Sequence, residues 1–132
     1  SLKKHCQQNL WLVFGCGGNR DKGKRSQMGA FAEHWADHII VTDDNPRFEN
    51  GQDIVKDILS GFGVSNDCNY KNNVEVIQNR ALAIQNAIAR ASNDDCILVA
   101  GKGHESYQEI NGEQLAFSDS QVVIDALKMR VG

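Results

Sequence analysis

The segment DDNPRFE, residues 43–49, places an amide, a proline and a guanidinium directly after an apolar run and before a helical one. Asn45 and Arg47 on a turn stiffened by Pro46 suit a carboxylate, because Arg presents a planar fork of donors to both oxygens, whereas Lys acts as a point charge. The same residue types are common in ordinary strand-to-helix turns. Taken alone, the segment is compatible with either a carboxylate site or a plain turn.

A second segment, GCGGNRDKGKR at residues 15–25, concentrates positive charge in an otherwise acidic chain. Its cations are Arg20, Lys22, Lys24 and Arg25. Such a loop favours an anion, and we interpret it as a flexible basic lid near a phosphate or a carboxylate. Lys22, Lys24 and Arg25 are the candidates for contact with a phosphate.

Two nucleotide-binding patterns nearly fit this basic loop. The glycines from Gly15 onward resemble a dinucleotide fingerprint, but Arg20 stands where a third glycine lets helix and strand pack closely. Residues 18–24 fit G-x-x-x-x-G-K, but Arg25 replaces the Ser or Thr that would hold magnesium. The loop therefore does not predict a complete nucleotide cradle.

A third segment, GKGHE at residues 101–105, follows another apolar run. Its glycines let the backbone approach a ligand closely, and Glu105 can accept hydrogen bonds from an ammonium group. A lone His104 is more often a packing or surface residue than a catalytic base. Guanidinium groups, an amide and a carboxylate together complement an amino acid, so the three segments favour a zwitterionic ligand.

Alternating apolar runs and one-sided helical patterns indicate the elements that position these segments. Four short apolar runs predict strands, at residues 10–14, 39–42, 74–77 and 96–100. Between them, apolar residues recur at helical spacing, as at Met28, Phe31, Ala32, Trp35 and Ile39. We expect an α/β fold, Rossmann-like, with a mainly parallel sheet covered by helices on both faces. In such a sheet, the loops after the strands meet at one edge, where ligands bind.

The last third of the chain departs from this alternation. Residues 107–110 and 114–117 flank Asn111 and Gly112, a pair suited to a two-residue hairpin turn. We expect a C-terminal antiparallel hairpin that adds an edge to the sheet. Ser118 then starts the last helix with a capping-box pattern.

Composition narrows the class of protein. The chain has 132 residues and a net charge of −3, which suits one domain and argues against general affinity for nucleic acid. No apolar stretch approaches the roughly 18 residues of a membrane span, so no membrane partner is expected and the protein is predicted to be cytoplasmic. The four cysteines form no C-x-x-C pair and are expected to be reduced. His34 and His38 have ligand spacing, but we assign no metal to them, since Trp35 stands where the H-E-x-x-H pattern needs a glutamate.

The three segments, in this order and spacing, resemble the C-terminal domain of the Mur ligases, most closely those that add meso-diaminopimelate. The resemblance covers essentially the whole chain, residues 1–132. It implies an ATP- and Mg²⁺-dependent reaction in peptidoglycan synthesis. There a carboxylate of UDP-N-acetylmuramoyl-L-alanyl-D-glutamate becomes an acyl phosphate that the amine of diaminopimelate attacks.

The same resemblance implies which residues surround diaminopimelate: Arg20, Asp44, Asn45, Pro46, Arg47, Gly101 and Glu105. The arginines would hold a carboxylate, while Glu105 and the Gly101 carbonyl would take an ammonium. Departures from the family pattern are Asn19 in place of Asp and Ser26 in place of Pro, and neither removes a proposed contact.

The family's P-loop and its magnesium-binding lysine are not found in these 132 residues. We therefore expect the UDP-substrate and ATP to bind through upstream domains, and the isolated domain to fold without catalysing ligation. Two alternatives stay open. One is a stand-alone module that senses an amino acid or phosphate, and the other is a dinucleotide-dependent oxidoreductase domain.

Overall fold

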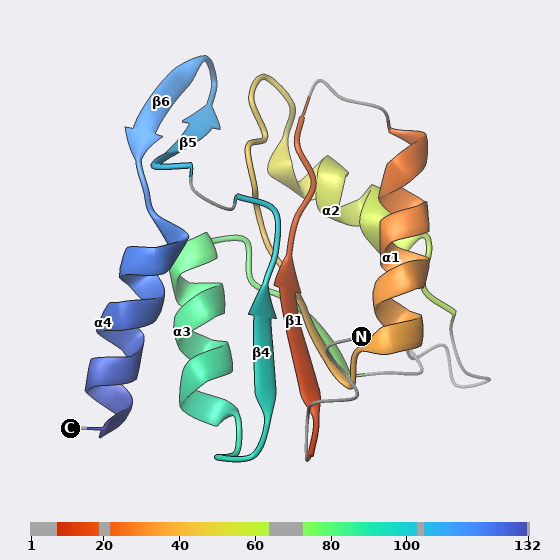
Figure 1. The fold of residues 1–132 in the computed structure, drawn as a ribbon. Helices are drawn as coiled ribbons and strands as arrows, with labels where there is room; N and C mark the ends of the chain where they lie inside the picture. Colours follow the sequence, from red (N-terminus) through yellow and green to blue (C-terminus); the bar gives the residue numbers. More distant parts are fainter. Residues whose placement is uncertain (1–7, 19–21, 64–72, 103–104, 132) are drawn as a thin grey trace.

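A computed structural model of the chain describes residues 8–18, 22–63, 73–102 and 105–131. Four parallel strands form one sheet, with α1 and α2 on one face and α3 and α4 on the other (Figure 1). The elements are, in chain order, β1 (Leu10–Phe14), α1 (Gly23–Trp35), β2 (His38–Val41), α2 (Gly51–Leu59), β3 (Asn73–Val76), α3 (Arg80–Arg90), β4 (Cys96–Val99), β5 (Tyr107–Ile110), β6 (Glu113–Ala116) and α4 (Asp119–Val131). The predicted fold class is confirmed, and the four predicted strands of the sheet agree to within one residue at each end.

The strand order, β3-β2-β1-β4, determines where a ligand can bind. The chain first adds strands on one side of β1 and then crosses to its other side to form β4. In open α/β sheets, this switch point opens a crevice at the carboxyl ends of the strands. The loops that begin at Gly15, Thr42 and Ala100 all emerge at that edge.

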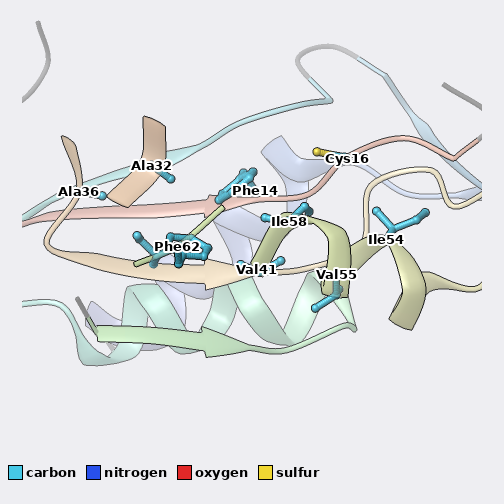
Figure 2. Close-up of a cluster of buried hydrophobic side chains, with 10 residues drawn as sticks. Phe14, Cys16, Ala32, Ala36, Val41, Ile54, Val55, Ile58 and Phe62 are labelled. Atoms are coloured by element: carbon cyan, nitrogen blue, oxygen red, sulfur yellow. The ribbon is translucent and has the colours of Figure 1, made fainter. Parts of the chain in front are cut away.

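The core is built by alternation along the central strands. Phe14 and Val41 face α1 and α2, where they pack with Ile54, Ile58 and neighbouring residues (Figure 2). On the opposite face, buried side chains of β1 and β2 pack against α3 and α4; the set includes Trp11, Val13, Ile40, Ile84, Ala87 and Ala126. Each fully buried large apolar side chain contributes about 1.5–3 kcal/mol of transfer free energy, which fixes the strands and hence the loops at their ends.

Helix α1 departs from the predicted apolar stripe. Ala32 is buried as expected, but Phe31 is 67% exposed, and Met28 and Trp35 are each a little over 40% exposed. The helix instead buries Gly29, where an added Cβ would lie 2.2 Å from the carbonyl oxygen of Ile58 in α2. The two helices approach so closely that small residues occupy the contact, and the large ones remain outside it.

The hairpin is present, but its predicted place was wrong. β5 and β6 pair antiparallel around Asn111 (φ 52°) and Gly112 (φ 81°). Positive φ at both residues is the backbone of a mirror-image turn. The two strands form a separate two-stranded sheet and do not extend the four-stranded one. The hairpin lies over the loop after β2, to which an isolated parallel bridge between Arg47 and Ile110 connects it.

Side-chain caps start three helices. The Asn50 and Asn79 side chains accept hydrogen bonds from the first turns of α2 and α3. The Ser118 hydroxyl accepts from the Gln121 amide at 3.2 Å, as the capping-box pattern predicts. The Gln121 side chain does not complete the box, since it donates to Asp125 instead.

The expectation that all cysteines are reduced was wrong. Cys96 is disulfide-bonded and only half-buried at the start of β4. Cys16, by contrast, is a buried free thiol. Cys6 and Cys68 lie outside the described residues.

The two histidines with ligand spacing do not share a helix. His34 belongs to α1, whereas His38 starts β2 and its ring stacks on Trp11 with the centroids 4.1 Å apart. Helical spacing therefore does not apply to the pair. No helix in the described ranges is long and apolar enough to cross a membrane.

Candidate functional site

A cavity of about 460 Å³ opens at the switch point of the sheet. Gly15, Asp44 and Gly101 line it, and they follow β1, β2 and β4 respectively. Its other lining residues are Cys16, Gly17, Lys24, Arg25 and Met28. All three segments selected from the sequence therefore reach the same edge, as the topology requires.

The first two loops are joined through Gly18. Its amide donates to the Asn45 carbonyl at 2.7 Å, and its carbonyl accepts from Nη1 of Arg47 at 3.0 Å. An added Cβ at Gly18 would lie 1.8 Å from the Pro46 carbonyl oxygen, so only glycine fits this contact. Pro46 therefore serves as a rigid surface against which the basic loop packs.

Arg47 has a left-handed backbone, with φ 54°. Such a conformation costs a non-glycine residue on the order of 1–3 kcal/mol. Two backbone hydrogen bonds with the hairpin hold it: the Arg47 amide donates to the Glu109 carbonyl at 3.0 Å, and the Asn111 amide donates to the Arg47 carbonyl at 2.7 Å. Nε of Arg47 also lies 2.8 Å from a Glu109 carboxylate oxygen, so the hairpin sets the direction of the guanidinium.

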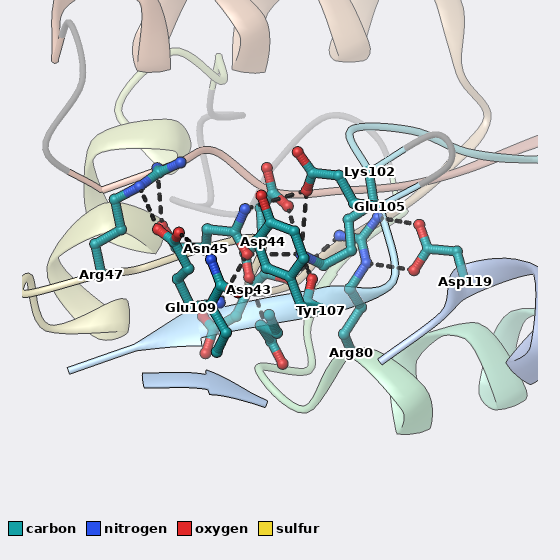
Figure 3. Close-up of polar contacts among 12 residues, drawn as sticks. Asp43, Asp44, Asn45, Arg47, Arg80, Lys102, Glu105, Tyr107, Glu109 and Asp119 are labelled. Carbon is teal, nitrogen blue, oxygen red and sulfur yellow. Dashed lines mark hydrogen bonds and ion pairs between the residues drawn. The ribbon is translucent and has the colours of Figure 1, made fainter. Parts of the chain in front are cut away.

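Asn45 is the centre of the polar cluster and is only 3% exposed (Figure 3). Its Oδ1 accepts hydrogen bonds from Nζ of Lys102 at 2.7 Å and from the Glu109 amide at 2.9 Å. Its Nδ2 donates to a Glu105 carboxylate oxygen at 3.2 Å. Asn45 therefore connects the loop after β2 to the loop after β4.

Lys102 also belongs to this cluster, although sequence reasoning did not select it. Its side chain is fully buried, and Nζ lies 3.2 Å from Oδ1 of Asp44 and 3.8 Å from Oε1 of Glu105. It also donates to the Tyr107 carbonyl at 3.0 Å. A cation between the two glycines of the loop that follows the apolar run at residues 96–100 was the signal in the sequence.

Arg80 was missed as well. Its Nε and Nη2 contact the two carboxylate oxygens of Asp119, each at 2.7 Å, and the Arg80 side chain is fully buried. The same guanidinium donates to the carbonyls of Asp43 and Ala100, at 3.2 and 3.0 Å. One residue thus joins the ends of β2 and β4 to the first turns of α3 and α4.

The structure describes residues 15–18 and 22–25 of the basic loop, so Arg20 lies outside the described residues. The Lys22 side chain is 72% exposed, and Lys24 is exposed beside the cavity. Arg25, by contrast, is buried and pairs with carboxylates of Glu49 and Asp57 at 2.8 and 2.9 Å. Its hydrogen bond to Glu49 raises its pKa.

Burial changes the pKa of two groups at this edge of the sheet. It raises the pKa of the Cys16 thiol to about 11, although nearby Arg25 acts in the opposite direction. Burial also raises the pKa of Asp43, while a hydrogen bond from Gln78 lowers it. The Cys16 thiol, which lines the cavity, therefore stays protonated at neutral pH.

A parallel sheet with a polar cluster at its switch point defines an α/β ligand-binding domain. The family model described as "Mur ligase, glutamate ligase domain" matches residues 1–103. The chain belongs to this family.

Curated relatives and a solved structure agree with this assignment. The chain is 52% identical over its whole length to UDP-N-acetylmuramoyl-L-alanyl-D-glutamate--2,6-diaminopimelate ligase of Xanthomonas campestris pv. campestris (strain 8004), covering 26% of that protein. It is 49% identical over 97% of its length to the ligase of the same name from Haemophilus influenzae (strain Rd), covering 25% of it. A solved structure of a ligase with this name superposes on 99% of the chain and 26% of that structure, with a TM-score of 0.91 and 40% identity. The chain thus spans about a quarter of the length of these relatives.

Proposed function

We propose that the chain is the amino-acid-binding domain of an ATP-dependent ligase that joins meso-diaminopimelate to UDP-N-acetylmuramoyl-L-alanyl-D-glutamate. The names and high identity of the relatives support this proposal. Because the chain covers a quarter of their length, the sites for the UDP-substrate and most of the ATP site belong to other parts of the longer protein. The ligase works in the cytoplasm, and residues 1–132 alone bind without catalysing ligation.

The observation that carries the proposal is the direct link from Arg47 through Asn45 to Glu105. Nη1 of Arg47 lies 3.5 Å from the Asn45 carbonyl oxygen, and the side-chain amide of the same Asn45 holds Glu105. A guanidinium and a carboxylate held this way complement the carboxylate and ammonium of one amino acid centre. Arg47 binds the carboxylate, with Arg20 as its second partner. Glu105 and the Gly101 carbonyl bind the ammonium, and Asp44 and Pro46 complete the wall.

The basic loop supplies contacts to nucleotide phosphate. Lys22 and Lys24 fit this role, because Lys24 borders the cavity and the Lys22 side chain is mostly exposed. Arg25 positions the loop, since its side chain is buried and pairs with Glu49 and Asp57. ATP, when bound with Mg²⁺, supplies the phosphoryl group that activates the acceptor carboxylate. Among the described residues, no cluster of three or more His, Cys, Asp or Glu could hold a metal ion, so we assign none of them to Mg²⁺.

Substitution of Arg47 in the full-length ligase tests this function. Arg47→Lys keeps the charge but loses the planar guanidinium, so we expect the KM for diaminopimelate to rise by about 10- to 100-fold, the equivalent of one charge-assisted hydrogen bond. The KM for ATP should stay within twofold. Arg90→Lys is the matched control, because Arg90 pairs with Glu75 on an exposed surface. Equal rises in both KM values for Arg47→Lys would contradict the proposal.

One observation favours a stand-alone sensing module as the second candidate, because the Asn45 cluster is complete within this chain. Calorimetry with diaminopimelate on residues 1–132 separates the two functions. Micromolar affinity without any other part of the ligase would favour the module. Affinity that appears only in the full-length protein would favour the ligase.

A further inference from the structure

The buried ammonium of Lys102 lies behind the proposed diaminopimelate site. Its side chain is fully buried, so a ligand in the cavity cannot touch it. A buried charge costs several kcal/mol unless partners satisfy it, and Lys carries three donors and no acceptor. The described partners of Nζ are Asn45, Tyr107, Asp44 and Glu105, three of which belong to the proposed site.

The contact with Asn45 determines which way its amide faces. An ammonium can only donate, so its neighbour in Asn45 has to be the amide oxygen. This oxygen lies 2.7 Å from Nζ of Lys102. The Glu109 amide donates to the same oxygen and enforces the same assignment. Nδ2 is therefore directed at Glu105, where it holds one carboxylate oxygen.

The charge of Lys102 also acts on the acidic side of the site. Asp44 and Glu105 come from different loops, yet they place carboxylate oxygens 3.2 and 3.8 Å from Nζ. Without a cation beside both of them, the two like charges would repel each other. Lys102 thus keeps both carboxylates at the place where the ammonium of a ligand arrives.

We propose that Lys102 is the positioning residue that gives the site its selectivity for a ligand with a second ammonium and carboxylate centre. It fixes Asn45 and Glu105 without touching the ligand. This inference rests on the proposed function and adds the residue that orients the binding groups. Asn45 also contacts Arg47, the proposed carboxylate partner, through its carbonyl oxygen. Loss of Lys102 should therefore weaken recognition of diaminopimelate more than recognition of lysine, which lacks the second carboxylate.

The test uses the full-length ligase with Lys102→Met, Lys102→Arg and the control Arg90→Met. For Lys102→Met we expect the KM for diaminopimelate to rise by about 10- to 100-fold, the range of one charge-assisted hydrogen bond. The preference for diaminopimelate over lysine, measured as kcat/KM, should fall at least tenfold. The KM values for ATP and the UDP-substrate should remain within twofold, and Arg90→Met should change none of these quantities.

Lys102→Arg keeps the protein testable if the methionine variant does not fold. It retains the cation between Asp44 and Glu105 but moves the donors away from Asn45, so the KM for diaminopimelate should rise at least threefold. A second measurement adds Lys102→Met to Asn45→Ala. If Lys102 acts through Asn45, the double variant should have a diaminopimelate KM within twofold of that of Asn45→Ala alone.

The outcomes separate this inference from the proposed function. A wild-type protein that does not add diaminopimelate in the presence of ATP and Mg²⁺ overturns both. An active wild type whose Lys102 variants keep their diaminopimelate KM and selectivity overturns only the inference. Parallel rises in all three KM values together with a lower Tm would also overturn it, because they would indicate a purely structural role.

Discussion

Two regions at the same edge of the sheet bury a cation, and they differ in what surrounds it. Around Arg80, the partner carboxylate of Asp119 is itself 9% exposed, and two backbone carbonyls complete the shell. Around Lys102, the Glu105 partner is 39% exposed. A buried charge by itself therefore does not identify a binding site. The distinguishing feature is a buried cation whose partner carboxylate still reaches solvent.

The difference has an energetic basis. The Arg80 pair is bidentate and desolvated at both ends, so its disruption leaves an uncompensated buried charge. The Lys102 cluster keeps acceptor capacity at Glu105 that a ligand ammonium can use. The first arrangement holds elements together, whereas the second holds binding groups in place.

The strongest test of the comparison removes the buried ion pair between Arg80 and Asp119. Arg80→Met should lower the free energy of unfolding of the chain by about 3–5 kcal/mol, because it leaves Asp119 buried without its partner. Urea unfolding followed by circular dichroism measures the change. Arg90→Met, which removes the exposed ion pair with Glu75, should lower the free energy of unfolding by about 0–1 kcal/mol. Similar values for both variants would contradict the distinction.

The reactivity of Cys16 tests whether the wall of the cavity is as inaccessible to solvent as the burial of this thiol indicates. With a pKa of about 11 in place of 9.0, Cys16 should react with iodoacetamide at pH 8 roughly 100-fold more slowly than in the chain unfolded in guanidinium. Mass spectrometry of the Cys16 peptide gives both rates. The folded chain also keeps a proton that the unfolded chain releases above pH 9, so stability should fall between about pH 9 and 11. Equal rates in the two states would show that the thiol is accessible.

In the Lys102 cluster, ligand binding is expected to depend on the charge of Glu105. In the full-length ligase, Glu105→Gln should raise the KM for diaminopimelate by about tenfold, since a neutral acceptor is roughly half as strong as a charged one. The Tm should change little, because Glu105 is partly exposed. Glu113→Gln on the exposed strand β6 is the matched control. A large loss of stability in Glu105→Gln would place Glu105 in the structural class with Asp119.

The smallest expected effect concerns the hairpin that orients Arg47. Gly112→Ala forces a Cβ onto a residue with φ 81°, at 3.0 and 3.1 Å from atoms of the Phe48 ring. We expect a loss of about 1 kcal/mol in unfolding free energy. Asn111→Gly, at φ 52°, should lower the unfolding free energy by less, since glycine adopts positive φ without strain. Thermal unfolding of the two variants measures the difference, and the reverse order would contradict the turn assignment.

Local patterns predicted the sheet because its strands are short apolar runs bounded by polar loops. The same reasoning found the turn at Asn111 and Gly112, whose backbone depends on adjacent residues only. It failed on α1, where the buried residues other than Arg25 are small. Periodicity detects large apolar residues, and no local signal shows that Gly29 lies against the Ile58 carbonyl.

The candidate site was predictable as a set of loops and only partly as a network. Asn45, Arg47 and Glu105 were selected from residue type and position after a strand, and the structure joins them in one cluster. Arg80 and Lys102 were missed, because their importance comes from partners 39 and 57 residues away in sequence. A burial pattern can be read from neighbouring residues, but the partner of a buried cation cannot.

The hairpin meets the site through backbone hydrogen bonds on both sides of Arg47 and leaves β6 facing outward. Movement of Arg47 on ligand binding would therefore be transmitted to a strand whose outer side chains have no part in the site. An environment-sensitive dye attached through Glu113→Cys would make this hairpin an optical reporter of occupancy. It would report binding without touching any group that contacts the ligand.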